Sequence, residues 1–320
     1  MLTLLLTLKD RYDYTENILT YFNNIKFKYH IIIADGSSIQ NQEKLKQNIY
    51  KYNSISFDLI NFKPDNSLTD YYSKLQNTCH KIQTKYTLLI DNDDYFSEDG
   101  CSSAIQFLET NNDYVAAGQM CRFINHKNGL YFSNIKYKDI SSNDVNSRLD
   151  EYLNTPTVIW GLIVRTDVTI ECFNMLNNCD FKYLHLMEFL YNMFVISKGK
   201  IKYIYDKPCT YRRMITEDSF SMTFIDKEKH YNFYYKDYFY SDWIKLTSSV
   251  RNFSNISEKK LEKYWFRGCV NGFLESSRFK QILNRYSWLR FLYYKLKYRK
   301  TWSKKIKKFD LIFQKNKLSK

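Results

Sequence analysis

Three carboxylates follow a short apolar segment near the end of the first hundred residues. Residues 86–94 read YTLLIDNDD, so Asp91, Asp93 and Asp94 come directly after the apolar stretch. Carboxylates at one strand end repel one another unless a positive charge lies between them. Asp91 and Asp93 are spaced to share a hard divalent cation, and Mg²⁺ and Mn²⁺ prefer oxygen ligands of this kind. The alternative is a solvated acidic turn that precedes a helix beginning near Ser97.

Two similar polar segments occur earlier in the chain, each after an apolar run. They are residues 9–11 and 35–38, which follow runs at 3–7 and 30–34. Segments with the spacing of a helix lie between and after the apolar runs, over residues 18–22, 42–50, 68–82 and 97–110. Alternating strands and helices predict an α/β fold with a mostly parallel sheet and helices on both faces. Because ligands bind at the carboxyl ends of the strands in such sheets, we expect the three polar segments to meet at one edge.

The three segments together resemble the motifs of bacterial family-2-type glycosyltransferases, which have the Rossmann-like GT-A fold. Residues 3–11 (TLLLTLKDR) resemble the family's first strand and its Pro-Thr-Tyr-Asn-Arg turn. Residues 31–38 (IIIADGSS) resemble its Val-Val-Asp-Asp-Gly-Ser motif, and residues 86–94 its Tyr-Ile-x-Phe-Leu-Asp-x-Asp-Asp motif. Thr7 replaces the family's proline and Ala34 replaces the first acid of the second motif, so the resemblance leaves the nucleobase undetermined.

The resemblance implies a nucleotide-sugar donor and assigns residues to it. Leu8, Lys9 and Arg11 match the turn that walls the nucleobase. Asp35 matches the acid that accepts hydrogen bonds from the base or the ribose.

The same resemblance implies a metal cofactor, Mn²⁺ or Mg²⁺. Asp91 matches the acid near the ribose and the metal, and Asp93 matches the metal ligand that bridges to the donor diphosphate.

A general base is expected from a helix near residue 188. Family members carry a Glu-Asp pair about a dozen residues before a glycine that precedes a strand; here Glu188 stands eleven residues before Gly199, with Met187 before it. A carboxylate there would accept the proton of the attacking hydroxyl. Asp180 is the substitute candidate, and a helix-surface glutamate is the alternative. A mechanism that retains the anomeric configuration needs neither residue as a base. His185 is expected to be a packing residue.

Two arginines resemble a further family segment. Residues 211–221 resemble its Tyr-Arg-x-His-x-x-Ser pattern, although the histidine is replaced. The resemblance implies that Arg212 or Arg213 neutralises the leaving diphosphate. A structural ion pair with Glu217 or Asp218 is an equally good interpretation.

The net charge of +14 comes from the end of the chain. Residues 278–320 hold 15 basic residues and one acid, which leaves 33 basic and 33 acidic residues in the first 277. Aromatic residues are interleaved with these charges, a composition typical of a basic amphipathic helix on an anionic membrane surface. The alternatives are a solvated helix packed on the body and, without any nucleic-acid-binding motif, a nucleic-acid contact. We expect no nucleic-acid partner.

The compartment and the domain division follow from the remaining patterns. Seven cysteines without a CxxC pair favour a reduced, cytosolic protein, and no segment approaches the ~20 apolar residues that span a bilayer. We expect a cytoplasmic protein, peripheral on the inner face of the cell membrane. Residues 1–225 form the predicted GT-A domain, and residues 226–320 a helical, basic-aromatic region.

The leading functional hypothesis is a metal-dependent glycosyltransferase. It would move a sugar, favoured to be carried by UDP, to a hydroxyl of a bacterial surface glycan of the lipooligosaccharide, capsule or O-antigen type, free or lipid-linked. A nucleotidyltransferase is the enzymatic rival, but it usually needs a glycine-rich loop, and residues 1–35 contain no glycine. The non-enzymatic rival is a membrane- or nucleic-acid-binding protein with a degenerate body.

Overall fold

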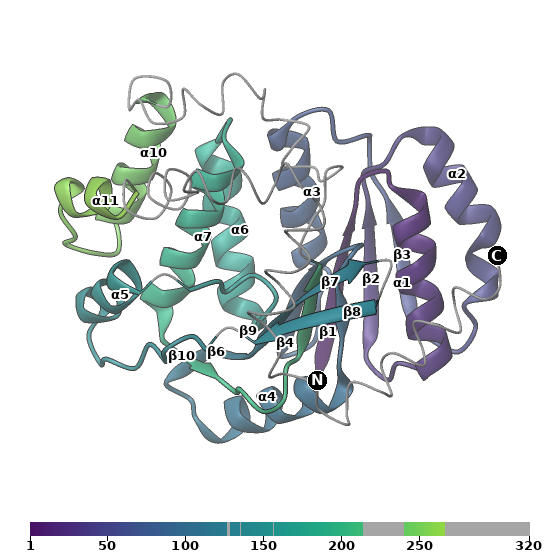
Figure 1. Ribbon diagram of the computed structural model, residues 1–320. Coiled ribbons are helices and arrows are strands. Elements are labelled where there is room, and N and C mark those ends of the chain that lie inside the picture. The colour runs from purple at the N-terminus through teal and green to yellow at the C-terminus, as the bar shows by residue number, and fades with distance from the viewer. Residues whose placement is uncertain (127–128, 135, 156, 214–239, 266–320) are drawn as a thin grey trace.

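The computed structural model describes residues 1–126, 129–134, 136–155, 157–213 and 240–265 (Figure 1). A seven-stranded sheet forms the centre of this part of the chain. Its strands lie in the order β10 (Lys200–Tyr203), β6 (Tyr114–Gly118), β9 (Ile163–Arg165), β4 (Tyr86–Asp91), β1 (Leu2–Leu8), β2 (His30–Asp35) and β3 (Phe57–Asn61).

The sheet is mostly parallel, as the sequence predicts. β1 pairs in parallel with β2 and β4, and β2 with β3, whereas β9 runs antiparallel to its neighbours β4 and β6. Thr7 pairs with both Ala34 and Asp91, and Leu8 pairs with Asp35. The carboxyl ends of β1, β2 and β4 therefore lie at one edge of the sheet.

Helices cover both faces of the sheet (Figure 1). The helices that precede residue 200 are α1 (Tyr12–Ile25), α2 (Ile39–Asn48), α3 (Leu68–Cys79), α4 (Glu98–Thr110), α5 (Val145–Asn154), α6 (Thr166–Cys179) and α7 (Leu184–Lys198), with a 3₁₀ turn η1 (Ile49–Lys51) after α2. Every residue of β1 is buried. Since successive side chains of a strand point to opposite faces, Leu5 packs with α3, α6 and α7, and Leu4 and Leu6 pack with α1 and α4. This burial on both sides explains why the strand is almost continuously apolar.

A second, four-stranded sheet lies against the end of the first. Its strands lie in the order β5 (Tyr95–Phe96), β11 (Thr210–Arg213), β7 (Met120–His126) and β8 (Gly129–Asn134). β5 follows the acidic turn after β4, and β11 runs antiparallel to β5 and parallel to β7. This pairing brings residues 210–213 close to the acids of residues 91–94.

The start of α4 holds the segment that leads into β11. A side chain at Gly100 would place its Cβ 2.1 Å from the carbonyl oxygen of Pro208, so the backbones approach too closely for any other residue. Ser97 caps the helix, since its side chain accepts a hydrogen bond from the Gly100 N–H, as the sequence predicts.

The described residues after 213 form two helices, α10 (Tyr240–Arg251) and α11 (Glu258–Trp265). Trp243 and Leu246 of α10 and Leu261 of α11 join the core on the α7 side of the sheet. The predicted domain boundary at residue 225 and the basic segment 278–320 lie outside the described residues. Within the described ranges, no helix combines the length and the apolar character that crossing a membrane requires.

Candidate active site at the carboxyl edge of the sheet

The turn after β1 has an unusual backbone. Asp10 and Arg11 both adopt the left-handed conformation, with φ of 53° each, although neither is glycine. The Asp10 N–H donates to the Ser37 hydroxyl at 2.8 Å, and the Asp10 carboxylate accepts from the Ser38 N–H and the Asn41 amide at 2.9 Å each. Burial raises the pKa of Asp10, but these hydrogen bonds outweigh burial and hold the pKa below its ordinary value. Contacts with the loop after β2 thus stabilise a strained turn.

The strained turn directs Arg11 at the acidic segment after β4. The Arg11 guanidinium forms an ion pair with Asp93, with 3.1 Å between Nη1 and Oδ2, and donates from Nη2 to Asn92 Oδ1 at 2.5 Å. It also lies over the Tyr14 ring, 5.1 Å from the centroid. Arg11 is thus the counter-ion of Asp93 in this structure, and its role beside a nucleobase stays a prediction.

Asp91 and Asp94 are carboxylates whose ionisation is disfavoured. Burial raises the pKa of Asp91, and the charge of Asp93 adds to this effect, while Arg212 and Arg11 partly oppose it. Burial also raises the pKa of Asp94 well above its ordinary value, with further contributions from Asp93 and Asp91. Burial and the neighbouring carboxylates thus disfavour full ionisation of the acidic segment.

Arg212 lies among these acids. Burial lowers the pKa of its guanidinium, but the charges of Asp94, Asp91, Glu188 and Asp93 outweigh burial and raise it. β11 supplies this arginine, and the predicted ion pair with Glu217 or Asp218 concerns residues outside the described ranges. The structure thus gives Arg212 four acidic neighbours from β4, the turn after it and α7.

Arg213 has a different environment. Its N–H donates to Asp94 Oδ1 at 3.2 Å, and its guanidinium lies over the Tyr14 ring, 4.5 Å from the centroid. The buried Nη1 atom of Arg213 has no hydrogen-bond partner among the residues that the structure describes. Arg213 therefore has a donor available for an anion at the edge of the acidic segment.

The two candidate bases lie in different places. Glu188 has a side chain that is 42% exposed, and its charge acts on both Asp91 and Arg212. Asp180 is exposed at the end of α6 and accepts a hydrogen bond from Thr69 of α3 at 2.5 Å. The structure thus brings Glu188, and not Asp180, to the acidic segment.

His185 was expected to be a packing residue, and its ring does pack edge-on against that of Tyr183, with 5.4 Å between the centroids, but it also contacts the candidate base. Its side chain is 35% exposed, and its Nδ1 lies 3.5 Å from Oε2 of Glu188, one turn further along α7. Burial raises the pKa of Glu188, but the hydrogen bond and charge of His185, with the charge of Arg212, outweigh burial and lower it. His185 therefore favours the ionised form of Glu188.

The remaining predicted residues meet at the ends of β1 and β2. Asp35 is buried and accepts from the Ser37 N–H at 2.8 Å. The Leu8 carbonyl accepts from the Lys74 ammonium at 2.9 Å, and Lys9 donates to the main-chain carbonyl of Asp65.

The sequence did not predict the ion pair between Lys74 and Asp65. It is almost completely buried, with side chains 1% and 0% exposed. A signal was present, because Lys74 stands three residues after Tyr71 and one before Leu75, on the buried face of α3.

The fit of a divalent cation depends on Asp91 and Asp93. In the described part of the chain, no group of three or more His, Cys, Asp or Glu side chains is arranged to hold a metal. Two neighbouring carboxylates still fit a hard cation that takes its other ligands from water or phosphate oxygens. Such a cation would oppose both the burial and the charge of Asp93, which raise the pKa of Asp91.

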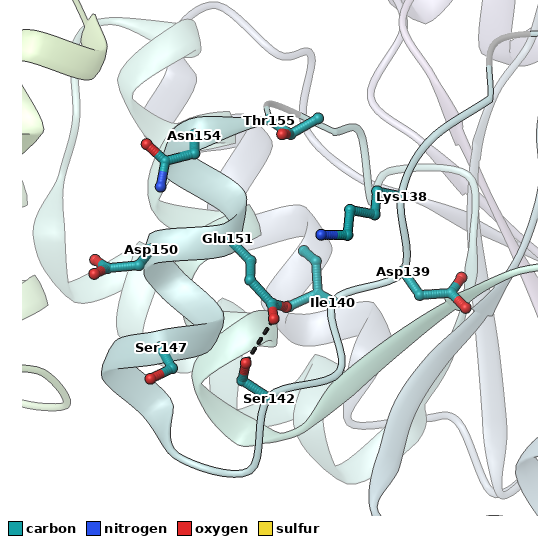
Figure 2. A pocket seen from close by; sticks show the side chains of 9 residues that line it. All are labelled: Lys138, Asp139, Ile140, Ser142, Ser147, Asp150, Glu151, Asn154 and Thr155. Carbon is teal, nitrogen blue, oxygen red and sulfur yellow. Dashed lines mark hydrogen bonds between the residues drawn. The ribbon is translucent and has the colours of Figure 1, made fainter.

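A cavity of about 310 Å³ is lined by other residues (Figure 2). They are Lys138, Asp139, Ile140, Ser142, Ser147, Asp150, Glu151, Asn154 and Thr155. The Ser142 hydroxyl donates to Glu151 at 2.5 Å, and the Ser141 N–H donates to the other carboxylate oxygen at 2.9 Å. Both carboxylate oxygens of Glu151 already accept hydrogen bonds, and no predicted site residue lines this cavity. We therefore do not include the cavity in the candidate active site.

Comparison with known proteins gives structural matches. No protein-family model matches the chain, and no curated protein matches its sequence. The structure of residues 1–349 of S. aureus TarS in complex with UDP-GlcNAc superimposes with a TM-score of 0.57 at 14% identity, covering 86% of this chain and 77% of that one. The complex of the same protein with UDP gives a TM-score of 0.52 at 14% identity, covering 87% and 74%. At this identity the similarity shows the fold alone, and the fold is of the GT-A type.

We predict that Asp94→Asn stabilises the protein at pH 8. The pKa of Asp94 is raised in the folded state, so the folded protein loses stability as the pH rises through that pKa. Asparagine has no proton to lose and gains no charge, and its oxygen can still accept from the Arg213 N–H. The melting temperature should rise by roughly 2–4 °C at pH 8, with a smaller difference at pH 5.

Asp113→Asn is the matched control for this measurement. The hydrogen bond from Lys200 lowers the pKa of Asp113, so removing its charge should not raise the melting temperature at pH 8. A lower melting temperature of Asp94→Asn at pH 8 would show instead that the fold needs this carboxylate as a partner of Arg212.

Proposed function

We propose that this protein is a glycosyltransferase of the family-2 type that transfers a sugar from a nucleotide-sugar to a hydroxyl group. The observation that carries the proposal is the convergence of Asp91, Asp93, Arg212 and Glu188 at the carboxyl edge of a GT-A sheet. β1 pairs with β2 on one side and with β4 on the other, so the strand order reverses at β1. In α/β sheets, ligands bind outside the carboxyl ends of the strands at such a point.

The donor lies across the ends of β1, β2 and β4 in this proposal. Leu8, Lys9 and Asp35 form its nucleoside side. UDP is the favoured nucleotide, and the UDP-GlcNAc and UDP complexes of TarS, which shares the fold, support this choice.

The diphosphate lies beside the acidic segment. Asp91 and Asp93 would hold Mn²⁺ or Mg²⁺, which supplies positive charge for the diphosphate oxygens. Arg213 would donate from Nη1 to the leaving diphosphate. The buried Nη1 atom, which has no hydrogen-bond partner among the described residues, supports this role. Arg212 favours the ionised forms of Asp91 and Asp94, because its charge opposes the rise in their pKa values.

Glu188 is the proposed general base. As the acceptor oxygen attacks the anomeric carbon, its proton moves to the Glu188 carboxylate, and the bond from that carbon to the diphosphate oxygen breaks with its electrons. Glu188 is ionised at neutral pH, as a base has to be before it can accept the proton, and its partly exposed side chain is accessible to an acceptor.

The acceptor and the location remain as the sequence suggests them. We place the acceptor among bacterial surface glycans, free or lipid-linked, and the protein on the inner face of the cell membrane. The basic, aromatic residues 278–320 would attach it there, each basic residue near the surface contributing about 1 kcal/mol.

Removing the cation should stop the reaction. Chelation with EDTA is expected to abolish sugar transfer from a UDP-sugar, and Mn²⁺ or Mg²⁺ to restore it. Asp93→Ala should weaken Mn²⁺ binding in calorimetry and reduce transfer about 100-fold. Asp58→Ala, at an exposed acid of β3, should change neither. Full activity both with EDTA and in Asp93→Ala would exclude a metal role for this segment.

Replacing the proposed base should affect the chemical step. Glu188→Gln is expected to lower kcat by about 10²–10⁴ and to leave UDP binding unchanged. His185→Gln should raise the pKa of Glu188, so activity is lost at a higher pH as the pH falls, measured as kcat/KM against pH. Glu171→Gln, at an exposed residue of α6, is the control. An unchanged kcat in Glu188→Gln would contradict its role as base.

The basic segment should attach the protein to anionic vesicles. The full chain is expected to float with vesicles that contain anionic lipid and to dissociate as the salt concentration rises. A chain that ends at Ser277 should stay with the unbound protein at the bottom of the gradient. Equal flotation of the two chains would exclude residues 278–320 as the attachment.

A further inference from the structure

The buried ion pair between Lys74 and Asp65 lies beneath the loops assigned to the nucleoside. Lys74 is on the middle of α3, and Asp65 is in the loop that joins β3 to α3. Burial lowers the pKa of Lys74 and raises the pKa of Asp65, so the surroundings disfavour the charged forms of both groups, while each partner's charge opposes this effect. One oxygen of Asp65, Oδ1, has no hydrogen-bond partner within the described ranges.

Such a pair is a poor source of stability. Taking two charges out of water costs about as much as their attraction returns, and neutral residues of the same size are often equally stable in its place. The buried oxygen without a partner adds to this cost. The reason for the pair is therefore better sought in what it holds in position.

The pair bonds to the backbone of two loops. The Lys74 ammonium donates to the Leu8 carbonyl at 2.9 Å, and this carbonyl also accepts from the Gly36 N–H at 3.0 Å. The Asp65 N–H donates to the Gly36 carbonyl at 2.8 Å, and the Lys9 ammonium donates to the Asp65 carbonyl. The ends of β1 and β2 are thus connected through these two residues.

Gly36 allows the Asp65 carboxylate to lie against the loop after β2. A Cβ at Gly36 would stand 2.4 Å from both Cγ and Oδ1 of Asp65. The charge of the neighbouring Asp35 also acts on Lys74. The pair is therefore in direct contact with the segment that carries the predicted nucleoside ligand.

We propose that Lys74 and Asp65 are positioning residues that hold Leu8, Lys9 and Asp35 in place for the nucleoside part of the donor. The two side chains are buried beneath the loops, so they act through these residues and do not touch the reacting atoms. The inference rests on the proposed function, and it assigns the pair to donor affinity rather than to the rate of transfer.

A neutral pair separates positioning from stability. Asp65→Asn/Lys74→Met removes both charges at nearly constant volume and should melt close to the wild type. We expect its Kd for UDP, measured by calorimetry, and its KM for the UDP-sugar to rise roughly tenfold or more, with kcat within about twofold of the wild type. The single variant Lys74→Arg keeps the positive charge and should retain most of the affinity of the wild type for UDP.

Two further variants complete the experiment. Gly36→Ala displaces Asp65 without removing a charge and should raise KM in the same way, which provides a test if the double variant does not fold. Lys202→Met, on β10, breaks the half-buried ion pair with Asp139 and should leave UDP binding unchanged.

The outcomes are distinct. A folded double variant that binds UDP as the wild type does, or one whose kcat falls while KM is unchanged, overturns the positioning role and leaves the proposed function intact. Failure of the wild type to bind UDP contradicts the proposed donor, and the inference falls with it.

Discussion

One guanidinium among four carboxylates is the constraint on which the rest of the site depends. Asp91, Asp93, Asp94 and Glu188 all act on Arg212, and they come from β4, from the turn after it and from α7. In a partly buried site these acids could not remain ionised together without a cation between them. The pairing of β11 with β5 and β7 carries Arg212 to the end of β4. The small second sheet therefore supplies the positive charge that opposes the acids at the carboxyl end of β4.

The parts of this arrangement that were predictable have local signals. An apolar strand followed by a polar turn marks the ends of β1, β2 and β4, and parallel pairing then brings these ends together. The surroundings of Arg212 have no such signal, because they depend on contacts such as that of Arg213 with Asp94, 119 positions apart. The contact of His185 with Glu188 was missed because spacing alone does not show that the start of α7 faces the acids. Lys74 had a signal, a charge on an apolar helix face, but its partner Asp65 lies in a loop that no periodicity describes.

The fold tolerates extensive sequence change because its requirements are mostly compositional. The sheet needs apolar residues in β1, β2 and β4, and many combinations of Leu, Ile and Val satisfy this need. A GT-A sheet can therefore be shared with TarS at 14% identity. The site has stricter requirements, because a shift of one residue in the register of β4 would move Asp91 away from Thr7.

The two left-handed residues after β1 have a consequence for how this protein can be altered. Glycine adopts that conformation at no steric cost, so Arg11→Gly would relieve backbone strain and also remove the counter-ion of Asp93. Folding and charge balance thus select for opposite residues at one position. The heat resistance of an Arg11→Gly variant would therefore show which contributes more to stability at this position, the relief of the backbone or the ion pair with Asp93.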